Sequence, residues 1–156
     1  MSVVAWRIVQ RKFAKLAFTG EGARLFGGRW NSPGYVVVYT AQSLALAALE
    51  ILVHVDSDKQ LQNYVAIPVT IDPQLITQVD ESALPNNWRA YPASEATRTI
   101  GDAWISNGVL PVLQVPSTVI PTEFNFLLAP SHKDFRKLRI GKPQRFRFDW
   151  RLTNNP

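Results

Sequence analysis

With 156 residues, of which 46% are apolar and 19% charged, the chain is expected to form one domain (residues 1–156) with a hydrophobic core rather than a disordered segment. Because the chain has no cysteine, disulfides, a Cys-ligated zinc site and a thiol nucleophile are excluded. The net charge of +5 resides in the C-terminal segment, since residues 131–156 hold eight bases and two acids, and the rest of the chain nine bases and ten acids.

The first third of the chain predicts a turn, a buried strand and a helix. Residues 1–12 contain no long apolar stretch, so no secretion signal is expected and a cytoplasmic location is predicted. A glycine-rich turn at 27–34 leads into an apolar strand at 36–40 that is expected to be buried on both faces. Ser43 is predicted to cap a helix over residues 44–54, whose apolar run is too short to cross a membrane.

Strands and a helix are predicted for the middle of the chain. Residues 64–71 are typical of a strand, in which Pro68 favours an edge or a bulge. A helix is predicted from Ser94 to Asn107, ending at Gly108, with one buried face formed by Ala96, Ile100, Ala103 and Trp104. Two further strands are predicted at residues 110–115 and 124–128.

The last predicted strand covers residues 145–152. Apolar and charged side chains alternate there, which predicts one face in the core and one charged face in water; the apolar residues are Phe146, Phe148, Trp150 and Leu152. Strands and helices follow one another without regular alternation along the chain. The sequence therefore predicts an α+β fold, with a compact mixed or antiparallel β core flanked by short helices.

Glu50 is the first candidate for chemistry. It lies in a helix that is apolar nearly all round, a pattern typical of a buried helix. A buried carboxylate must be paired, hydrogen-bonded or neutralised, because an unpaired buried charge is too costly. Glu50 is therefore either a core carboxylate bound to an arginine or a backbone amide, or a catalytic group.

Arg29 and Tyr39 are the second group of candidates. Gly27 and Gly28 let the backbone turn sharply or approach a ligand closely, and they hold Arg29 at a corner before the buried strand. A guanidinium at that place suits the phosphates or a ribose hydroxyl of a ligand, and the Tyr39 ring suits stacking on a flat ring. The alternative is that Arg29 pairs with Glu50, Trp30 fills the core and Tyr39 is an ordinary strand residue.

Ser117 and Asn125 form a third polar group between apolar strands. Neither His54 nor His132 lies in a nucleophile signature, so a Ser-His-Asp hydrolase is disfavoured and hydrogen-bonding roles are expected for both side chains. Turn formation is the alternative for each of them. The sequence has no metal-binding spacing, no phosphate-binding loop and no GxGxxG motif, so neither a metal site nor a Rossmann fold is expected.

An ordered set of short motifs resembles the RES-domain toxin family. The motifs cover nearly the whole chain: Trp6-Arg7-Ile8, Gly27-Gly28-Arg29-Trp30-Asn31, Val38-Tyr39-Thr40-Ala41, Ala47-Ala48-Leu49-Glu50, Trp88, Ile100-Gly101-Asp102-Ala103-Trp104, Val115-Pro116-Ser117 and Phe148-Asp149-Trp150-Arg151-Leu152. The family is named for an arginine, a glutamate and a serine. The resemblance assigns these to Arg29, Glu50 and Ser117.

The resemblance implies a fold similar to that of diphtheria-toxin-like ADP-ribosyltransferases. It implies a bacterial toxin of a type II toxin–antitoxin system that depletes cellular NAD by phosphorolysis or hydrolysis, or that ADP-ribosylates a protein. It also implies an Xre-type antitoxin that occludes the active site in an oligomeric complex. NAD is then a substrate, inorganic phosphate is a candidate acceptor, and no permanently bound cofactor is expected.

The residues and the resemblance agree on one hypothesis. The predicted catalytic residues are Glu50, Arg29 and Tyr39; the predicted substrate-binding residues are Arg29, Tyr39, Ser117, Asn125, Gly28 and Trp30. Ionised Glu50 would stabilise the positive charge that develops on the ribose as nicotinamide leaves. A protein ADP-ribosyltransferase is one alternative, and a non-catalytic domain that binds nucleic acid or protein is another. Direct DNA binding is disfavoured, because the arginines and aromatics of 145–152 are expected on opposite faces.

Overall fold

The computed structural model describes residues 1–55 and 58–152; residues 56–57 and 153–156 of the predicted domain lie outside the described residues. Eight strands form one sheet in the order β4-β5-β6-β2-β1-β3-β7, and β8 pairs with the other end of β3. The strands are β1 (Val3–Gln10), β2 (Val38–Ala41), β3 (Tyr64–Ile71), β4 (Ile76–Gln78), β5 (Val112–Pro116), β6 (Phe124–Leu128), β7 (Arg139–Ile140) and β8 (Gln144–Phe146). Only the β4–β5 pair is parallel among the described strands, so the sheet is mixed.

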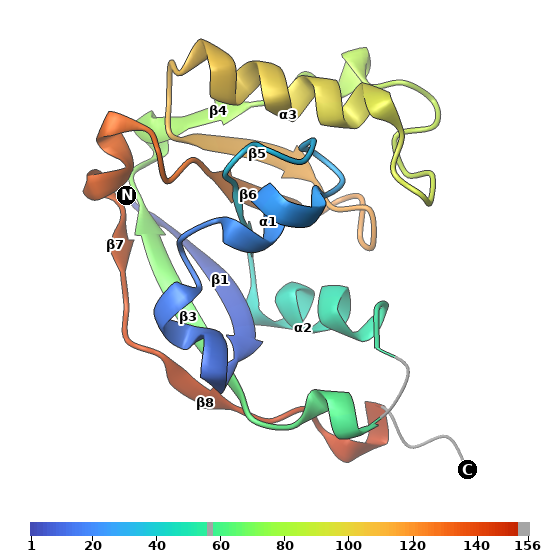
Figure 1. The fold of residues 1–156 in the computed structure, drawn as a ribbon, viewed down its shortest axis with the longest axis vertical. Coiled ribbons are helices and arrows are strands. Elements are labelled where there is room, and N and C mark those ends of the chain that lie inside the picture. Colours follow the sequence, from blue (N-terminus) through green and yellow to red (C-terminus); the bar gives the residue numbers. More distant parts are fainter. Residues whose placement is uncertain (56–57, 153–156) are drawn as a thin grey trace.

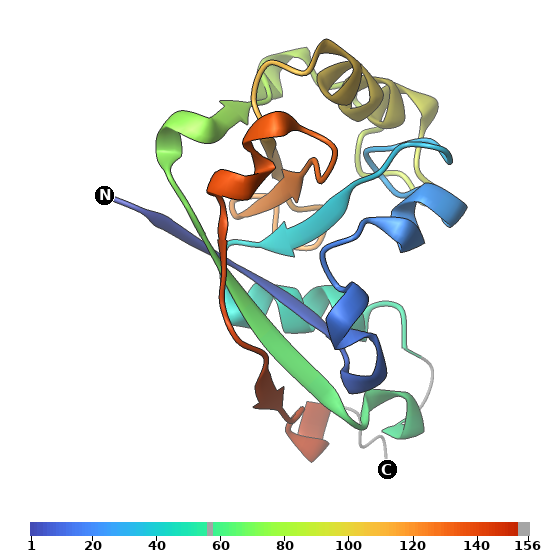
Figure 2. The ribbon, with the colours of Figure 1, turned by 60° about the vertical axis from the view of Figure 1, so that its left-hand side comes forward.

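The sheet divides between β1 and β2. A single register pair, Trp6 with Ala41, joins these two strands, whereas β1 pairs with β3 along its whole length. In Figures 1 and 2 the long β1–β3 ribbon runs toward one end of the molecule, and β2, β5 and β6 lie across the other half. Because the two strands diverge, a backbone carbonyl of β2 that faces β1 is available to a side chain of β1.

Three α-helices cover the sheet: α1 (Glu21–Phe26), α2 (Leu44–Leu52) and α3 (Glu95–Asn107). Helix α2 packs on β1 and β2, and α3 lies along the β4–β5 end of the sheet (Figure 1). Under α3 the core contains Trp30, Trp104, Leu113 and Leu127. Short 3-10 helices complete the chain: η1 (Arg11–Leu16), η2 (Asp58–Leu61), η3 (Pro73–Leu75), η4 (Glu81–Ala83), η5 (Lys133–Lys137) and η6 (Trp150–Leu152).

Several local predictions are confirmed. The fold is α+β, with a mixed sheet and short helices. Ser43 caps α2, since its hydroxyl accepts a hydrogen bond from the Leu46 amide at 3.0 Å. Gly108 ends α3 with a left-handed backbone at φ 59°, where a residue with a Cβ is strained. As a separate finding, none of the described helices combines the length and the apolar content that a membrane span requires.

The buried faces of the two longer helices differ from the prediction. Helix α2 is not buried all round, because it lies on one face of the sheet; Leu46 and Ala47 are buried, while Leu49 is exposed. Helix α3 buries Thr97, Gly101 and Trp104, whereas Ala96 and Ala103 face solvent. A small residue is therefore central to the α3 contact, which apolar periodicity does not detect.

The predicted strand at 145–152 is wrong beyond Phe146. Asp149 accepts hydrogen bonds from the backbone and guanidinium of Arg151, and this turn redirects the chain into η6. Trp150 and Leu152 consequently point to solvent, with 68% and 55% of their surface exposed.

Of the two positions predicted for Pro68, an edge or a bulge, the edge is wrong. Pro68 lies inside the sheet, between β1 and the segment that joins β7 to β8. Its carbonyl accepts from the Gly141 amide at 2.7 Å, so the missing donor of the proline faces the gap between those two short strands. The gap lets an interior strand tolerate a proline.

Candidate functional site

The Glu50 carboxylate is held by two donors from the sheet. The Ser117 hydroxyl donates to Oε1 at 2.9 Å, and the Asn125 side-chain amide donates to Oε2 at 2.9 Å. Helix α2 brings Glu50 to this place, while Ser117 follows β5 and Asn125 lies in β6. Glu50 is half-buried, and this burial raises the pKa of its carboxyl, although the two hydrogen bonds oppose the shift.

Both donors are themselves fixed. Ser117 Oγ accepts from the backbone amides of Val119 and Ile120 at 3.1 and 3.2 Å, so its single hydrogen is directed at Glu50. The Asn125 amide also donates to the Thr40 carbonyl at 3.1 Å. Ser117 and Asn125 are thus preorganised to solvate an ionised carboxylate. Direct contact of either side chain with a substrate remains a prediction.

Arg29 and Tyr39 form a second group that makes no ion pair with Glu50. Arg29 Nη1 donates to the carbonyls of Trp88 and Ala90 at 2.9 and 2.7 Å. Burial lowers the pKa of Arg29 and raises that of Tyr39, and the two side chains lie close enough for each charge to influence the other. The alternative in which Arg29 neutralises Glu50 is therefore wrong.

The Tyr39 ring is fixed by its hydroxyl. That hydroxyl donates to Asn31 Oδ1 at 2.6 Å and accepts from the Trp30 amide at 3.1 Å. In the β2–β6 register Tyr39 lies opposite Leu127, and Ala41 opposite Asn125. Tyr39 and Asn125 therefore project from the same face as diagonal neighbours, which puts the two groups side by side.

Helix α3 holds the turn that carries Arg29. Thr97 Oγ1 donates to the Arg29 carbonyl at 2.7 Å, and Asp102 accepts from the amide and hydroxyl of Ser32 at 2.9 and 2.6 Å. A Cβ on Gly101 would lie 1.6 Å from the Trp30 carbonyl oxygen, so only glycine permits this approach. The family motif around Gly101 therefore supports the Arg29 turn from a distant part of the sequence.

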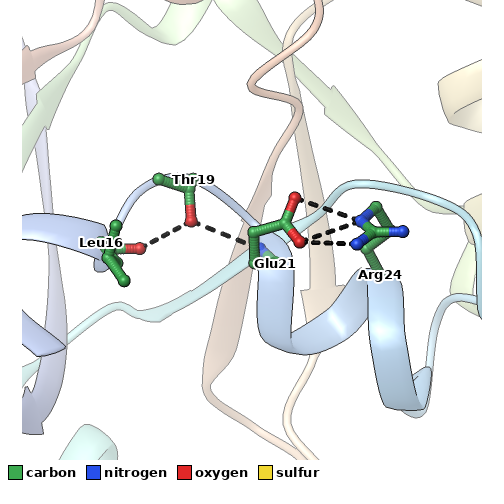
Figure 3. A network of polar contacts seen from close by, with 4 residues as sticks. All are labelled: Leu16, Thr19, Glu21 and Arg24. Carbon is green, nitrogen blue, oxygen red and sulfur yellow. Dashed lines mark hydrogen bonds and ion pairs between the residues drawn. The ribbon is translucent and has the colours of Figure 1, made fainter.

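Helix α1 supports the same turn from the other side. The Thr19 hydroxyl donates to Leu16 and accepts from the Glu21 amide, and Glu21 pairs with Arg24 (Figure 3). The Arg24 carbonyl in turn accepts a hydrogen bond from the Gly34 amide at 2.8 Å. The ordered start of α1 thereby fixes the end of the glycine-rich turn.

Gly28 and Trp30 contribute differently from their predicted roles. A Cβ on Gly28 would lie 2.6 Å from the Tyr39 hydroxyl, so the close approach is to Tyr39. The Trp30 side chain is 2% exposed and packs in the core, at a ring distance of 6.4 Å from Trp88. The predicted substrate contact of Trp30 is therefore corrected, since its indole is covered and only its backbone amide serves Tyr39.

Arg7 is a functional candidate that residue chemistry missed. It lies on β1, and its Nη1 donates to the Tyr39 carbonyl at 3.0 Å across the divergence of β1 and β2. Its Nε is buried and has no hydrogen-bond partner, and burial lowers its pKa to about 10. An arginine in an apolar strand was the available signal, since such a cation needs an anionic partner.

A loop joins the two groups. Arg89 donates to the Thr118 carbonyl through Nε and Nη2, at 3.0 and 2.8 Å, while Arg29 holds the carbonyls on either side of Arg89. The segment from Trp88 to Ala90 is thereby attached both to the Arg29 turn and to the residue that follows Ser117.

Among the described residues no group of three or more His, Asp or Glu side chains is arranged to hold a metal ion.

A family model described as the RES domain matches residues 4–151 of the chain. The chain belongs to the RES-domain family. A protein named Toxin Res from Yersinia enterocolitica is 39% identical to it over 151 residues, covering 96% of this chain and 99% of that protein. A Prs ADP-ribosylating toxin from a Sphingobium strain is 31% identical over 157 residues, covering 97% and 98%. This RES-domain protein is therefore a toxin of the RES family.

A solved structure confirms the fold of the RES domain. The chain superposes with a TM-score of 0.75 on a chain from the M. tuberculosis MbcT–MbcA toxin–antitoxin complex, covering 94% of this chain and 85% of that one. The two sequences are 19% identical, so this likeness concerns the fold alone. The fold described above is thus shared by a chain of an experimentally determined toxin–antitoxin complex.

Proposed function

We propose that this RES-domain toxin cleaves the bond between nicotinamide and ribose in NAD. The observation that supports this most directly is the half-buried Glu50 carboxylate, which two fixed donors hold; one of them, Asn125, lies on the same face of the sheet as Tyr39. Burial of Glu50 disfavours its ionised form, and the hydrogen bonds from Ser117 and Asn125 favour that form. Such a preorganised carboxylate is suited to stabilise a cation that appears only in the transition state.

The second group supplies the contacts for the rest of the dinucleotide. In this proposal nicotinamide stacks on the Tyr39 ring. The Arg29 guanidinium, which donates to two backbone carbonyls in the structure, binds the pyrophosphate. Arg7 adds a second cation whose Nε lacks a partner. As nicotinamide leaves, the ribose acquires oxocarbenium character, and Glu50 stabilises it by charge and by a hydrogen bond to a ribose hydroxyl.

The acceptor defines the reaction. Water gives hydrolysis and phosphate gives phosphorolysis, either of which would deplete NAD in the cytoplasm. Modification of a protein is the second candidate, and the relative named Prs ADP-ribosylating toxin favours it. Bond cleavage uses the same residues in each case, so substitutions in the site do not distinguish the three reactions. Mass analysis of the products formed with and without phosphate does, because each acceptor gives a product of different mass.

The proposal includes an Xre-type antitoxin that occludes the site. The supporting observation is the likeness of fold to a chain that was solved as part of a toxin–antitoxin complex. Occlusion of this kind predicts that saturating antitoxin stops NAD consumption. Undiminished turnover in the purified complex would contradict it.

The test of cleavage is the substitution Glu50→Gln. It preserves the size of the side chain and removes its charge, so NAD consumption should fall by about a hundredfold or more. The matched control is Glu81→Gln, at an exposed glutamate of η4, which should retain full activity. Circular dichroism establishes that both variants are folded, and turnover by Glu50→Gln at the rate of the unaltered protein would refute the mechanism.

A further inference from the structure

A concave pocket lies at the end of the sheet that is farthest from α3. Its volume is about 320 Å³, within the range of small-molecule sites, and its walls come from the start of η1, the end of η2, the start of β3, and β8 with the two residues after it. Figures 1 and 2 both show β8 and η2 together at this end of the molecule. None of its lining residues belongs to the Glu50 or Arg29 groups.

Three arginines line this pocket: Arg11, Arg145 and Arg147. Among the residues whose side chains the structure describes (1–55 and 60–152), the lining contains no aspartate or glutamate, and none of the three guanidinium groups makes an ion pair with any of them. Other arginines of the chain do pair, as Arg24 does with Glu21 and Arg151 with Asp149. Three like charges around one concavity repel each other unless an anion binds between them.

The backbone under these arginines is fixed before any ligand arrives. Strand β8 pairs with β3, with Phe146 opposite Tyr64 and Arg145 opposite Val65. Phe148 contacts Phe146 and Tyr64 edge to face, with ring centroids 4.9 and 5.4 Å apart. The Arg11 amide donates to the Asn63 carbonyl at the pocket wall. Little backbone conformational entropy is therefore lost when the guanidinium groups bind a ligand.

We propose that this pocket binds the phosphate groups of a small anionic ligand. The planar guanidinium group donates two parallel hydrogen bonds to a phosphate, which a point-like ammonium does not, and all three cations of the pocket are arginines. A pocket of this volume favours a compact ligand over a polymer. Moreover, the aromatic rings are engaged with one another edge to face and offer no stacking platform for the bases of a nucleic acid.

The test is calorimetric titration of the full chain with inorganic pyrophosphate. The unaltered protein should show saturable binding that weakens with added salt, and the double substitution Arg145→Gln and Arg147→Gln should weaken it by about tenfold or more. The matched control is Arg136→Gln with Arg139→Gln, which removes two exposed arginines outside the pocket and should leave the affinity unchanged. Thermal unfolding establishes that both double variants are folded.

Further titrants identify the source of the phosphate. ADP that binds more tightly than pyrophosphate identifies a nucleotide, and equal affinity identifies a free polyphosphate anion. No saturable binding of pyrophosphate, or an equal loss in both double variants, would overturn the proposal. It would also be overturned if a single-stranded oligonucleotide bound more tightly than pyrophosphate through Arg145 and Arg147. The outcome is independent of NAD cleavage, because none of these residues contacts Glu50.

Discussion

At Glu50 two physical effects oppose each other. Burial penalises the charged carboxylate, while the donors on Ser117 and Asn125 stabilise it, and burial is the larger effect, since the pKa of Glu50 is raised. Neither donor carries a positive charge, so no ion pair cancels the carboxylate. Because no positive charge of the protein neutralises it, the ionised Glu50 carboxylate can stabilise a cation that forms beside it.

The raised pKa predicts the acid limb of the pH–rate profile. If the ionised form of Glu50 acts, kcat/KM for NAD should fall as the pH falls through the folded pKa, at a midpoint above the ordinary value of 4.5. The measurement is kcat/KM across the acidic range. An acid limb centred at or below 4.5 would be inconsistent with burial as the dominant effect.

Stability should change in the opposite direction with pH. The folded protein holds the Glu50 proton more tightly than the unfolded chain does, so ionisation lowers the free energy of unfolding as the pH rises from the unfolded pKa through the folded pKa. Glu50→Gln lacks this contribution. The stability difference between the two proteins should therefore depend on pH only within that window, as urea unfolding at several pH values would show.

At the scale of elements, α3 and the Arg29 turn form one unit. Thr97 and Asp102 hydrogen-bond the turn, and Gly101 lets the helix approach the Trp30 carbonyl. Arg89 extends the contact to the residue that follows Ser117. The position of Arg29 therefore depends on a helix that begins 66 residues later in the chain, at Glu95.

Gly101→Ala tests this contact. The added methyl meets backbone rather than a flexible side chain, so α3 must shift, and the free energy of unfolding should fall by about 1–3 kcal/mol or more. Gly22→Ala, in α1, is the control, because a Cβ there meets nothing within 4 Å and alanine favours a helix. Equal stability of the two variants in urea unfolding would show that α3 does not need the close approach.

At the scale of the whole molecule, the proposed site collects residues from β1, β2, α2, β6 and the loops around Arg29 and Ser117. A ligand that joins these segments should stabilise the fold, because it binds only the folded state. By linkage, NAD at a hundred times its Kd adds about 2.7 kcal/mol to the free energy of unfolding. The inactive Glu50→Gln variant permits the measurement, since it would not consume the ligand.

Thermal unfolding of Glu50→Gln with and without NAD is the experiment. The midpoint should rise with NAD concentration, and Glu81→Gln, which should consume NAD, provides the active comparison. An unchanged midpoint of Glu50→Gln at millimolar NAD would argue that this chain does not bind the dinucleotide at all.

The sequence by itself determined the features that depend on near neighbours. The Ser43 cap, the end of α3 at Gly108 and the strand at 124–128 follow from turn chemistry and periodicity, which act over a few residues. The sequence also restricted Glu50 to a paired or a functional carboxylate, because the cost of an isolated buried charge does not depend on the fold.

Only the tertiary structure decided which partners meet. The hydrogen bonds to Glu50 span 67 and 75 residues along the chain, and they exist because β6 pairs in a fixed register with both β2 and β5. The covered ring of Trp30 and the reach of Arg7 across the divergence of β1 and β2 likewise depend on packing between distant segments. Local periodicity contains no information about such registers, whereas the assembled sheet fixes them together.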